Sequence, residues 1–203
     1  MTSTFETFIV STSSEAAFSA AVAVAQNPGT VHNPLLLYGQ TGAGKTHLLY
    51  AIAHALHTQP IPTRTLIANL QDAIRSHTVH ALEESLATNE ALILDDFPFA
   101  PDHQHTREAL FAMLQKLSRK RVQIVIACKE LPSDVPEHAV VVEVGYPTGD
   151  ARLEILRRQA AMRGLALSDD VLQSLADRCS GNPRELQAMI TRIAAESLLQ
   201  RNE

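Results

Sequence analysis

Residues 39–46 read Gly-Gln-Thr-Gly-Ala-Gly-Lys-Thr, which matches the pattern GxxxxGK[ST] in full. A buried-strand sequence, Leu35 to Tyr38, precedes the motif, and a helix with one apolar face is expected from Thr46 to His57. The glycines let backbone N–H groups wrap around phosphate oxygens, and the N-terminus of the next helix adds partial positive charge. This strand–loop–helix order restricts the chain to folds that carry a phosphate-binding loop.

The loop residues have predicted roles in binding a nucleotide. Lys45 is predicted to neutralise charge on the β- and γ-phosphates, and the Thr46 hydroxyl is predicted to bind Mg²⁺. ATP or ADP with Mg²⁺ is therefore the expected ligand, and a chance glycine-rich turn is the alternative. The motif and the histidine after it give the predicted nucleotide-binding set: Gly39, Gln40, Thr41, Gly42, Ala43, Gly44, Lys45, Thr46 and His47.

Two adjacent acids follow the buried strand Ala91 to Leu94. In proteins with a phosphate-binding loop, an aspartate at such a strand end holds Mg²⁺. Asp95 is predicted to be that metal ligand, together with Thr46, and Asp96 is predicted to orient or deprotonate the attacking water. The alternative is a turn or helix cap made by aspartate. Asp95 and Asp96 are thus the predicted catalytic residues.

Strand-like and helix-like segments alternate through residues 1–146, which predicts an α/β fold with a mostly parallel five-stranded sheet flanked by helices. From Thr148 onward the pattern is helical only, with a predicted cap at Ser168. We therefore expect a nucleotide-binding domain over residues 1–146 and a small helical domain over residues 147–203. The first helix is expected to begin at a cap within Ser13-Ser14-Glu15, and residues 69–87 to form a broken helix. The expected strands are Leu35–Tyr38, Thr65–Ala68, Ala91–Leu94, Val122–Ala127 and Ala139–Val144.

Composition and charge exclude several classes of protein. Hydrophobic residues make up 45% of the 203 residues and charged residues 19%, so the chain can form a core and wholesale disorder is excluded. The formal net charge of -5 argues against autonomous DNA binding. No apolar run approaches ~18 residues and no signal peptide is recognisable, so a cytoplasmic protein without a membrane span is expected.

Cysteine and histidine spacing predicts no metal centre. Cys128 and Cys179 are the only cysteines, and neither belongs to a metal-ligand motif, so a disulfide framework and a structural zinc site are not expected. His103 and His105 lie near Asp102, but a metal site there needs further ligands. A solvated loop is expected at these residues.

Arg184 lies in the first turn of the last expected helix, after Gly181-Asn182-Pro183. A cation at that position opposes the helix dipole, so the arginine is expected to serve another purpose. One interpretation is an arginine that reaches the γ-phosphate of ATP. The other, of equal weight on local sequence, is a solvated side chain paired with Glu185 or Asp177.

Several segments together resemble the AAA+ ATPase domain of the bacterial replication initiator DnaA and its short relatives such as Hda. Residues 5–10 are similar to the family's opening F-x-x-F-V-V segment, and residues 23–29 and 33–39 to the helix and strand before its phosphate-binding loop. The double acid followed by Phe97 resembles its Walker B strand. Residues 182–186 resemble its sensor II motif N-V-R-E-L. The likeness runs from about residue 5 to about residue 197.

The resemblance implies roles for residues that local sequence leaves open. Arg184 stands at the sensor II position, which implies that it senses the γ-phosphate. The family's N-terminal segment lines the adenine pocket, which implies that role for Phe8, Ile9 and Val10.

The departures from the family pattern also carry expectations. No DNA-binding helix-turn-helix domain is expected to follow the helical lid, which agrees with weak or no autonomous DNA binding. Ala127-Cys128-Lys129 stands where the family usually has an acid as sensor I. Residues 132–140 contain no arginine, although DnaA proteins carry an arginine finger in that stretch. The segment that grips single-stranded DNA also looks shortened, and the clamp-binding motif of Hda-type proteins is absent.

These features predict a DnaA-like or Hda-like AAA+ protein that regulates or adapts chromosomal replication initiation. Its expected partner is DnaA or another AAA+ replication protein, and its own ATPase activity is expected to be weak or partner-dependent. The alternative is a self-assembling ATPase of the helicase-loader or remodelling type, which would form a nucleotide-dependent oligomer. A small-molecule kinase fits the helical C-terminal region and Arg184 poorly.

Overall fold

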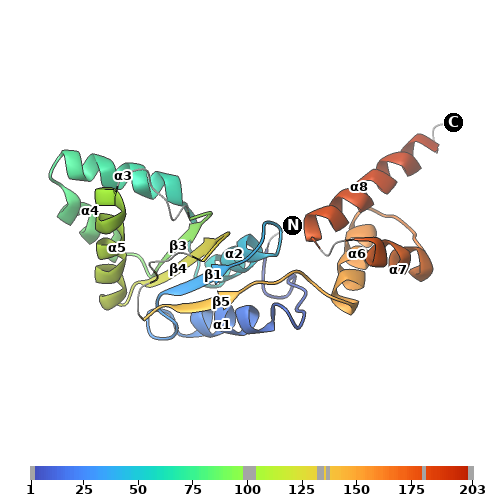
Figure 1. Cartoon of the computed structure of the whole chain (residues 1–203), viewed down its shortest axis with the longest axis horizontal. Coiled ribbons are helices and arrows are strands. Elements are labelled where there is room, and N and C mark those ends of the chain that lie inside the picture. Colours follow the sequence, from blue (N-terminus) through green and yellow to red (C-terminus); the bar gives the residue numbers. More distant parts are fainter. Residues whose placement is uncertain (1–2, 98–103, 132–134, 136–137, 180–181, 201–203) are drawn as a thin grey trace.

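The computed structural model describes residues 3–97, 104–131, 135, 138–179 and 182–200. Five parallel strands form one sheet in the order β2-β3-β4-β1-β5 (Figure 1). The strands are β1 (Leu35–Tyr38), β2 (Ile61–Pro62), β3 (Ala91–Asp95), β4 (Gln123–Cys128) and β5 (Val140–Glu143). The predicted α/β fold with a parallel five-stranded sheet is confirmed.

Helices cover both faces of this sheet because successive strand residues point to opposite sides. Leu35 and Leu37 of β1 face the core that helices α1 (Glu15–Gln26) and α2 (Lys45–Ala55) complete. Leu36 faces the opposite core, which helices α3 (Thr63–Arg75), α4 (Val79–Ala87) and α5 (Gln104–Arg119) complete. The same alternation continues in β3 and β4, so the central strands are buried on both sides.

The expected strand at Thr65–Ala68 is wrong. Those residues belong to α3, and the strand next to β3 is the two-residue β2. Leu66, Leu70 and Ala73 are buried at spacings of four and three residues, which is the pattern of one helix face. The short apolar run was misread as a strand because periodicity over four residues does not distinguish the two structures.

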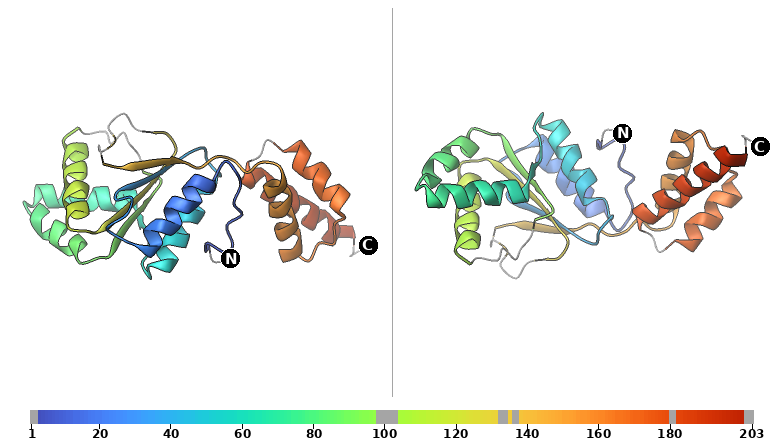
Figure 2. Two further views of the ribbon diagram at one scale, coloured as in Figure 1. Left: turned by 90° about the horizontal axis from the view of Figure 1, so that it is seen from below. Right: turned by 90° about the horizontal axis from the view of Figure 1, so that it is seen from above.

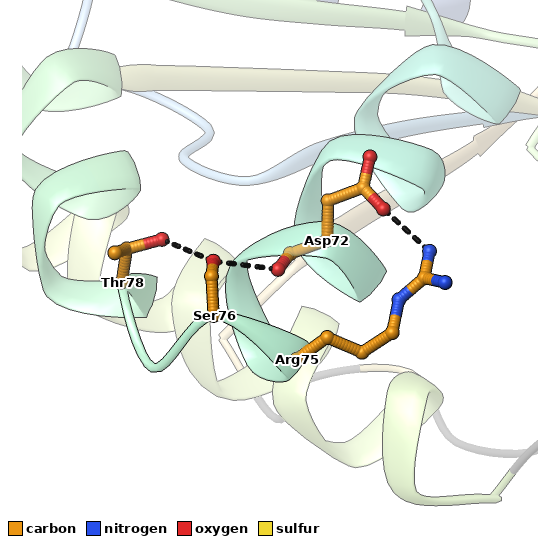
Figure 3. Close-up of polar contacts among 4 residues, drawn as sticks. All are labelled: Asp72, Arg75, Ser76 and Thr78. Carbon is orange, nitrogen blue, oxygen red and sulfur yellow. Dashed lines mark hydrogen bonds and ion pairs between the residues drawn. The ribbon is translucent and has the colours of Figure 1, made fainter.

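A hydrogen-bonded turn separates α3 from α4, so the predicted break within residues 69–87 is confirmed (Figure 3). The Ser76 hydroxyl donates to the Asp72 carbonyl at 2.7 Å and lies 2.9 Å from the Thr78 hydroxyl. Arg75 pairs with the Asp72 carboxylate. At its other end, α3 is tied to the sheet by the Thr63 hydroxyl, which donates to the Asp95 carbonyl at 2.7 Å.

Three further helices form a separate group at the C-terminal end of the chain (Figure 2). They are α6 (Asp150–Met162), α7 (Asp169–Arg178) and α8 (Pro183–Gln200). Leu156, Leu172 and Ile190, one from each helix, share a small apolar core. The division proposed between residues 146 and 147 falls in the connection between β5 and α6.

The two predicted helix caps differ in outcome. The Ser168 hydroxyl accepts a hydrogen bond from the Val171 N–H at 3.5 Å, as the cap of α7. Ser14 makes no side-chain cap bond to α1. Its hydroxyl instead accepts from the Ser11 N–H at 3.0 Å, because the turn at residues 11–14 offers a nearer donor. Within the described residues, no helix combines the length and the apolar character needed to span a bilayer.

Candidate functional site

The predicted phosphate-binding loop connects β1 to α2, and Gly44 directly precedes the first residue of that helix. Gly42 has a φ of +89°, and Gly44 a φ of +109°. A β-carbon on Gly42 would lie 2.4 Å from Oδ1 of Asn182, and one on Gly44 would lie 3.0 Å from the Phe8 ring. Glycine is therefore required at both positions by backbone angle and by close neighbours from other parts of the chain.

Lys45 lies over this loop. Its Nζ donates hydrogen bonds to the Gly39 carbonyl at 2.6 Å and the Gln40 carbonyl at 2.9 Å. Burial lowers the pKa of Lys45, while the nearby Asp95 and Asp96 carboxylates act to raise it. The ammonium is thus placed between the phosphate-binding loop and the two acids, where it can neutralise an anionic ligand.

Asp95 and Asp96 follow one another at the carboxyl end of β3. The Asp96 N–H donates to Oδ1 of Asp95 at 2.9 Å, and Asp96 itself has a φ of +51° and is exposed. Both acids line a cavity of about 470 Å³, together with Tyr50 and Arg64. The predicted metal ligand and the predicted water-orienting residue therefore line one solvent-accessible cavity at the end of β3.

Arg184 extends from the start of α8 toward the same loop. The Asn182 side chain accepts a hydrogen bond from the Arg184 N–H at 2.9 Å. Cγ of Arg184 would lie 3.3 Å from a β-carbon on Gly42. The positive charge of Arg184 also acts to lower the pKa of Lys45. One cation at the start of α2 and one at the start of α8 therefore lie at the loop.

A cavity of about 260 Å³ continues from the loop into the space between the N-terminal segment, α2 and the C-terminal helices. Phe8 and Ile9 line it, as do Ala43, His47 and Arg184. Val10 does not: its side chain is 41% exposed and borders a different hollow beside residues 148–151. The residues that local sequence did not indicate are Ser3, Thr7, Ser11, Ser14, Gly145, Pro147, Ile155, Arg158, Gln159, Met162, Pro183 and Gln187.

The missed residues reach the cavity through tertiary contacts. Arg158 is one example: its Nη1 lies 3.5 Å from the Glu6 carbonyl, and its Nε pairs with Glu154 at 2.8 Å. The Ser13 hydroxyl donates to the Tyr146 carbonyl at 2.5 Å, which fixes the connection to α6 beside the cavity. No local motif marks these residues. They could have been identified only from knowledge of which distant segments of the chain contact one another.

Cys128 and Lys129 lie at the end of β4, where the family has sensor I, and they differ in burial. The Cys128 thiol is buried and donates to the Leu37 carbonyl at 3.9 Å. Burial raises the pKa of Cys128 to about 11, so the thiol stays protonated. Lys129 is 61% exposed and lies 4.0 Å from Glu130.

Oxygen donors suited to Mg²⁺ are present beside the loop. Thr46 is exposed in the first turn of α2, and Asp95 is half-buried at the end of β3. Mg²⁺ is bound in nucleotide sites by one or two protein oxygens together with phosphates and water. The residues therefore fit that ion, although the described part of the chain holds no cluster of three or more histidine, cysteine or acidic side chains. Asp102 and His103 lie outside the described residues. The loop expected at His105 is wrong, because that residue belongs to α5.

Comparison with known proteins identifies the family. Residues 1–142 match the bacterial DnaA ATPase domain, and residues 149–203 match the lid domain of Hda. The chain belongs to the bacterial DnaA ATPase-domain family. The resemblance to DnaA and its short relatives and the AAA+ fold are thereby confirmed.

The curated relatives are chromosomal replication initiator proteins DnaA. That of Lactiplantibacillus plantarum is 31% identical, over 97% of this chain and 47% of the relative. That of Thermus thermophilus is 31% identical, over 95% of this chain and 48% of the relative. The chain thus spans about half the length of these relatives.

Solved structures support the same fold. Domain III of Thermotoga maritima DnaA superposes with a TM-score of 0.84 and 25% identity, covering 99% of this chain and 91% of that one. The AMPPCP-bound DnaA from Aquifex aeolicus has a TM-score of 0.80 and 23% identity, covering 94% and 63%. At that identity the second likeness concerns the fold alone.

Proposed function

We propose that this protein binds ATP or ADP with Mg²⁺ and acts as a nucleotide-dependent regulator or adaptor of chromosomal replication initiation. Its partner is DnaA or another AAA+ replication protein. The observation that carries the proposal is the convergence of Lys45, the two acids and Arg184 on one glycine loop. The family's relatives are named as replication initiators, and a neighbour of the same fold is described as bound to AMPPCP.

The phosphates would lie against residues 39–46. Loop amides and the N-terminus of α2 favour anionic oxygens, and Lys45 neutralises part of their charge. Thr46 and Asp95 would hold Mg²⁺, which would neutralise part of the phosphate charge. Arg184 approaches the loop at Gly42, so it would contact the γ-phosphate that distinguishes ATP from ADP. The base would occupy the cavity that Phe8 and Ile9 line. Val10 borders a different hollow, so it would not contact the base there.

Hydrolysis would depend on a partner. Asp96 is exposed beside Asp95 and would orient the attacking water. An arginine finger is worth ~10³–10⁵ in rate, and residues 132–140 contain no arginine to supply one to a neighbouring copy. A partner AAA+ protein that contributes the arginine would therefore complete this site.

The self-assembling ATPase is the second candidate, because Asp95 and Asp96 both line one solvent-accessible cavity. Steady-state hydrolysis measured at increasing protein concentration separates the two. Slow turnover that is independent of concentration supports the regulator. A turnover number that reaches about 1 s⁻¹ and rises with concentration would favour self-assembly.

Nucleotide binding is tested by calorimetry with ATP and Mg²⁺. Lys45→Ala is expected to abolish detectable binding. Lys120→Ala, at an exposed lysine just after α5, is the matched control. ATP at 100 times Kd should also stabilise the wild type by about 2.7 kcal/mol, seen as a higher Tm. Wild-type affinity in the Lys45→Ala variant would refute the proposed site.

The proposed partnership is tested by adding this protein to a bacterial DnaA and measuring ATP hydrolysis. A change in the rate that Lys45→Ala removes supports a nucleotide-dependent regulator. An unchanged rate at saturating concentration, confirmed by the absence of a complex in sedimentation, would contradict the partnership.

A further inference from the structure

His47 stands in the first turn of α2, directly after the loop residues that contact phosphate in the proposed function. Its side chain contacts the N-terminal segment. Nε2 lies 3.0 Å from the Thr4 carbonyl and 3.1 Å from the Thr7 hydroxyl. Residues some forty positions apart in sequence are thereby joined at one imidazole nitrogen.

The chemistry of these neighbours fixes the proton on the ring. A carbonyl oxygen can only accept, so Nε2 is the protonated nitrogen and donates to Thr4. The Thr7 hydroxyl also donates to the Thr4 carbonyl, at 3.0 Å, and accepts from the Thr4 N–H at 3.0 Å. His47 therefore closes a compact hydrogen-bonded turn at residues 4–7.

The turn places the residues that follow it. The Phe8 ring meets the His47 ring edge to face at 5.3 Å and stacks on Phe18 at 5.8 Å. Phe8 also packs against the loop at Gly44. Phe8, Ile9 and His47 all line the cavity proposed for the base. The aromatic contacts hold the segment from the side, and the hydrogen bond from His47 to Thr4 fixes its position along α2.

We propose that His47 is the positioning residue that holds the base-binding segment in register with the phosphate-binding loop. This inference rests on the proposed nucleotide site. His47 follows Thr46 in the first turn of α2. This short segment of helix therefore sets the distance between the proposed phosphate site and the wall of the base cavity. The contact with the Thr4 carbonyl requires a single ring proton, on Nε2.

The alternative is that His47 merely fills space. An apolar packing role would not require a donor at a defined position, so side chains with donors at different places distinguish the two. Gln places an amide N–H close to where Nε2 stands, whereas Asn places one closer to Nδ1. His47→Gln and His47→Asn are therefore a matched pair, and His47→Ala removes the side chain.

The decisive experiment compares ATP with inorganic tripolyphosphate, which has phosphates but no base. His47→Ala and His47→Asn are expected to weaken ATP binding about tenfold and to leave tripolyphosphate binding within about twofold. His47→Gln should retain ATP binding within about threefold of the wild type. Equal weakening of both ligands, or no rescue by Gln relative to Asn, would overturn the inference.

Hydrogen exchange in the absence of ligand tests the same proposal independently of nucleotide. Amides of residues 4–9 should exchange faster in His47→Asn than in His47→Gln, while amides of β4 exchange alike in both. Identical exchange over residues 4–9 would overturn the positioning role. Failure of the wild type to bind either ATP or tripolyphosphate would instead refute the proposed function, so the two failures are distinguishable.

Discussion

The two ends of the candidate site are built in different ways. The phosphate end is one continuous loop, residues 39–46, held between a buried strand and a helix. The base end is assembled from residues 3–14, His47 of α2, the connection at residues 145–147, α6 and the start of α8, and it shares Ala43 with the loop. The first is a local structure, and the second exists only where distant segments meet.

This difference indicates which end of the site should respond when α6–α8 shift relative to the sheet domain. A loop fixed by neighbouring residues keeps its shape when α6–α8 shift, because its own backbone angles define it. A cavity with walls on both the sheet domain and the C-terminal helices changes volume with any such shift. The phosphate end should therefore set affinity, and the base end and Arg184 should report how the two parts of the molecule sit together.

Among the variants that separate the two ends, Arg184→Ala is expected to change nucleotide affinity the most. Arg184→Ala should weaken ATP relative to ADP by about 1–3 kcal/mol, or about 5- to 150-fold, because only ATP has the γ-phosphate. The apo Tm should stay nearly unchanged, since the side chain is exposed. Calorimetry with both nucleotides measures the ratio. Arg192→Ala, another exposed arginine of α8, is the control, and equal loss for ATP and ADP would assign Arg184 to shared phosphates.

The next effect concerns the point where the two ends touch. Gly42→Ala should weaken ATP about tenfold, since a β-carbon at φ +89° is strained and would lie 2.4 Å from the Asn182 side chain. Gly164→Ala shares a positive φ of +65° but has open space around it, so it should lower stability without changing affinity. Binding by titration and unfolding by heat separate the outcomes. Matching affinities in both variants would mean that Asn182 moves aside without consequence.

A smaller effect is expected from Arg158 at the base end. Arg158→Ala should weaken ATP and ADP equally, by about two- to fivefold, because an exposed polar contact contributes about 1 kcal/mol or less. Arg157→Ala, on the same turn of α6, is the control, since Arg157 pairs with Asp169 and does not line the cavity. Tripolyphosphate binding should be unaffected in both. A larger loss of affinity for tripolyphosphate than for ATP would assign Arg158 to the phosphate end.

The smallest effect is on stability against pH. The pKa of His47 is lowered from 6.5 chiefly by burial, so the unfolded chain takes up the proton first as the pH falls. The contribution of neutral His47 is therefore complete above about pH 6.5 and declines below it. Melting curves of the wild type and His47→Gln should diverge between about pH 7 and 5.5, with the wild type losing more stability. Parallel curves would contradict the lowered pKa.

Sequence predicted the phosphate end well because its determinants are contiguous. The spacing of Gly39 to Thr46 and the double acid after a buried strand each carry their own structural context. The base end was less accessible. The resemblance indicated Phe8, Ile9 and Val10, but which of them lines the cavity depends on the turn at residues 4–7, and Arg158 has no local signal. The contact between Arg184 and the loop depends on where the start of α8 lies relative to Gly42, which no pattern within α8 specifies.

The fold shows the same division. Parallel strands buried on both faces consist of consecutive apolar residues, which can be recognised in the sequence. The expected bounds of β1 and β3 agree with the observed bounds to within one residue. The short edge strand β2 was missed because two residues carry no periodicity. Its neighbour α3 was recognised only in its second half.

The hydrogen bond from Thr63 to the Asp95 carbonyl has a mechanical consequence. Helix α3 has 13 residues and is about 20 Å long, with one end held beside Asp95 and Asp96 and the other in the turn at Ser76. A small change in the tilt of α3 at Thr63 displaces the other end of the helix by a distance that grows with helix length. A tilt of about 5° at Thr63 carries the Ser76 turn through roughly 2 Å, which is enough to make or break side-chain contacts at that distant corner.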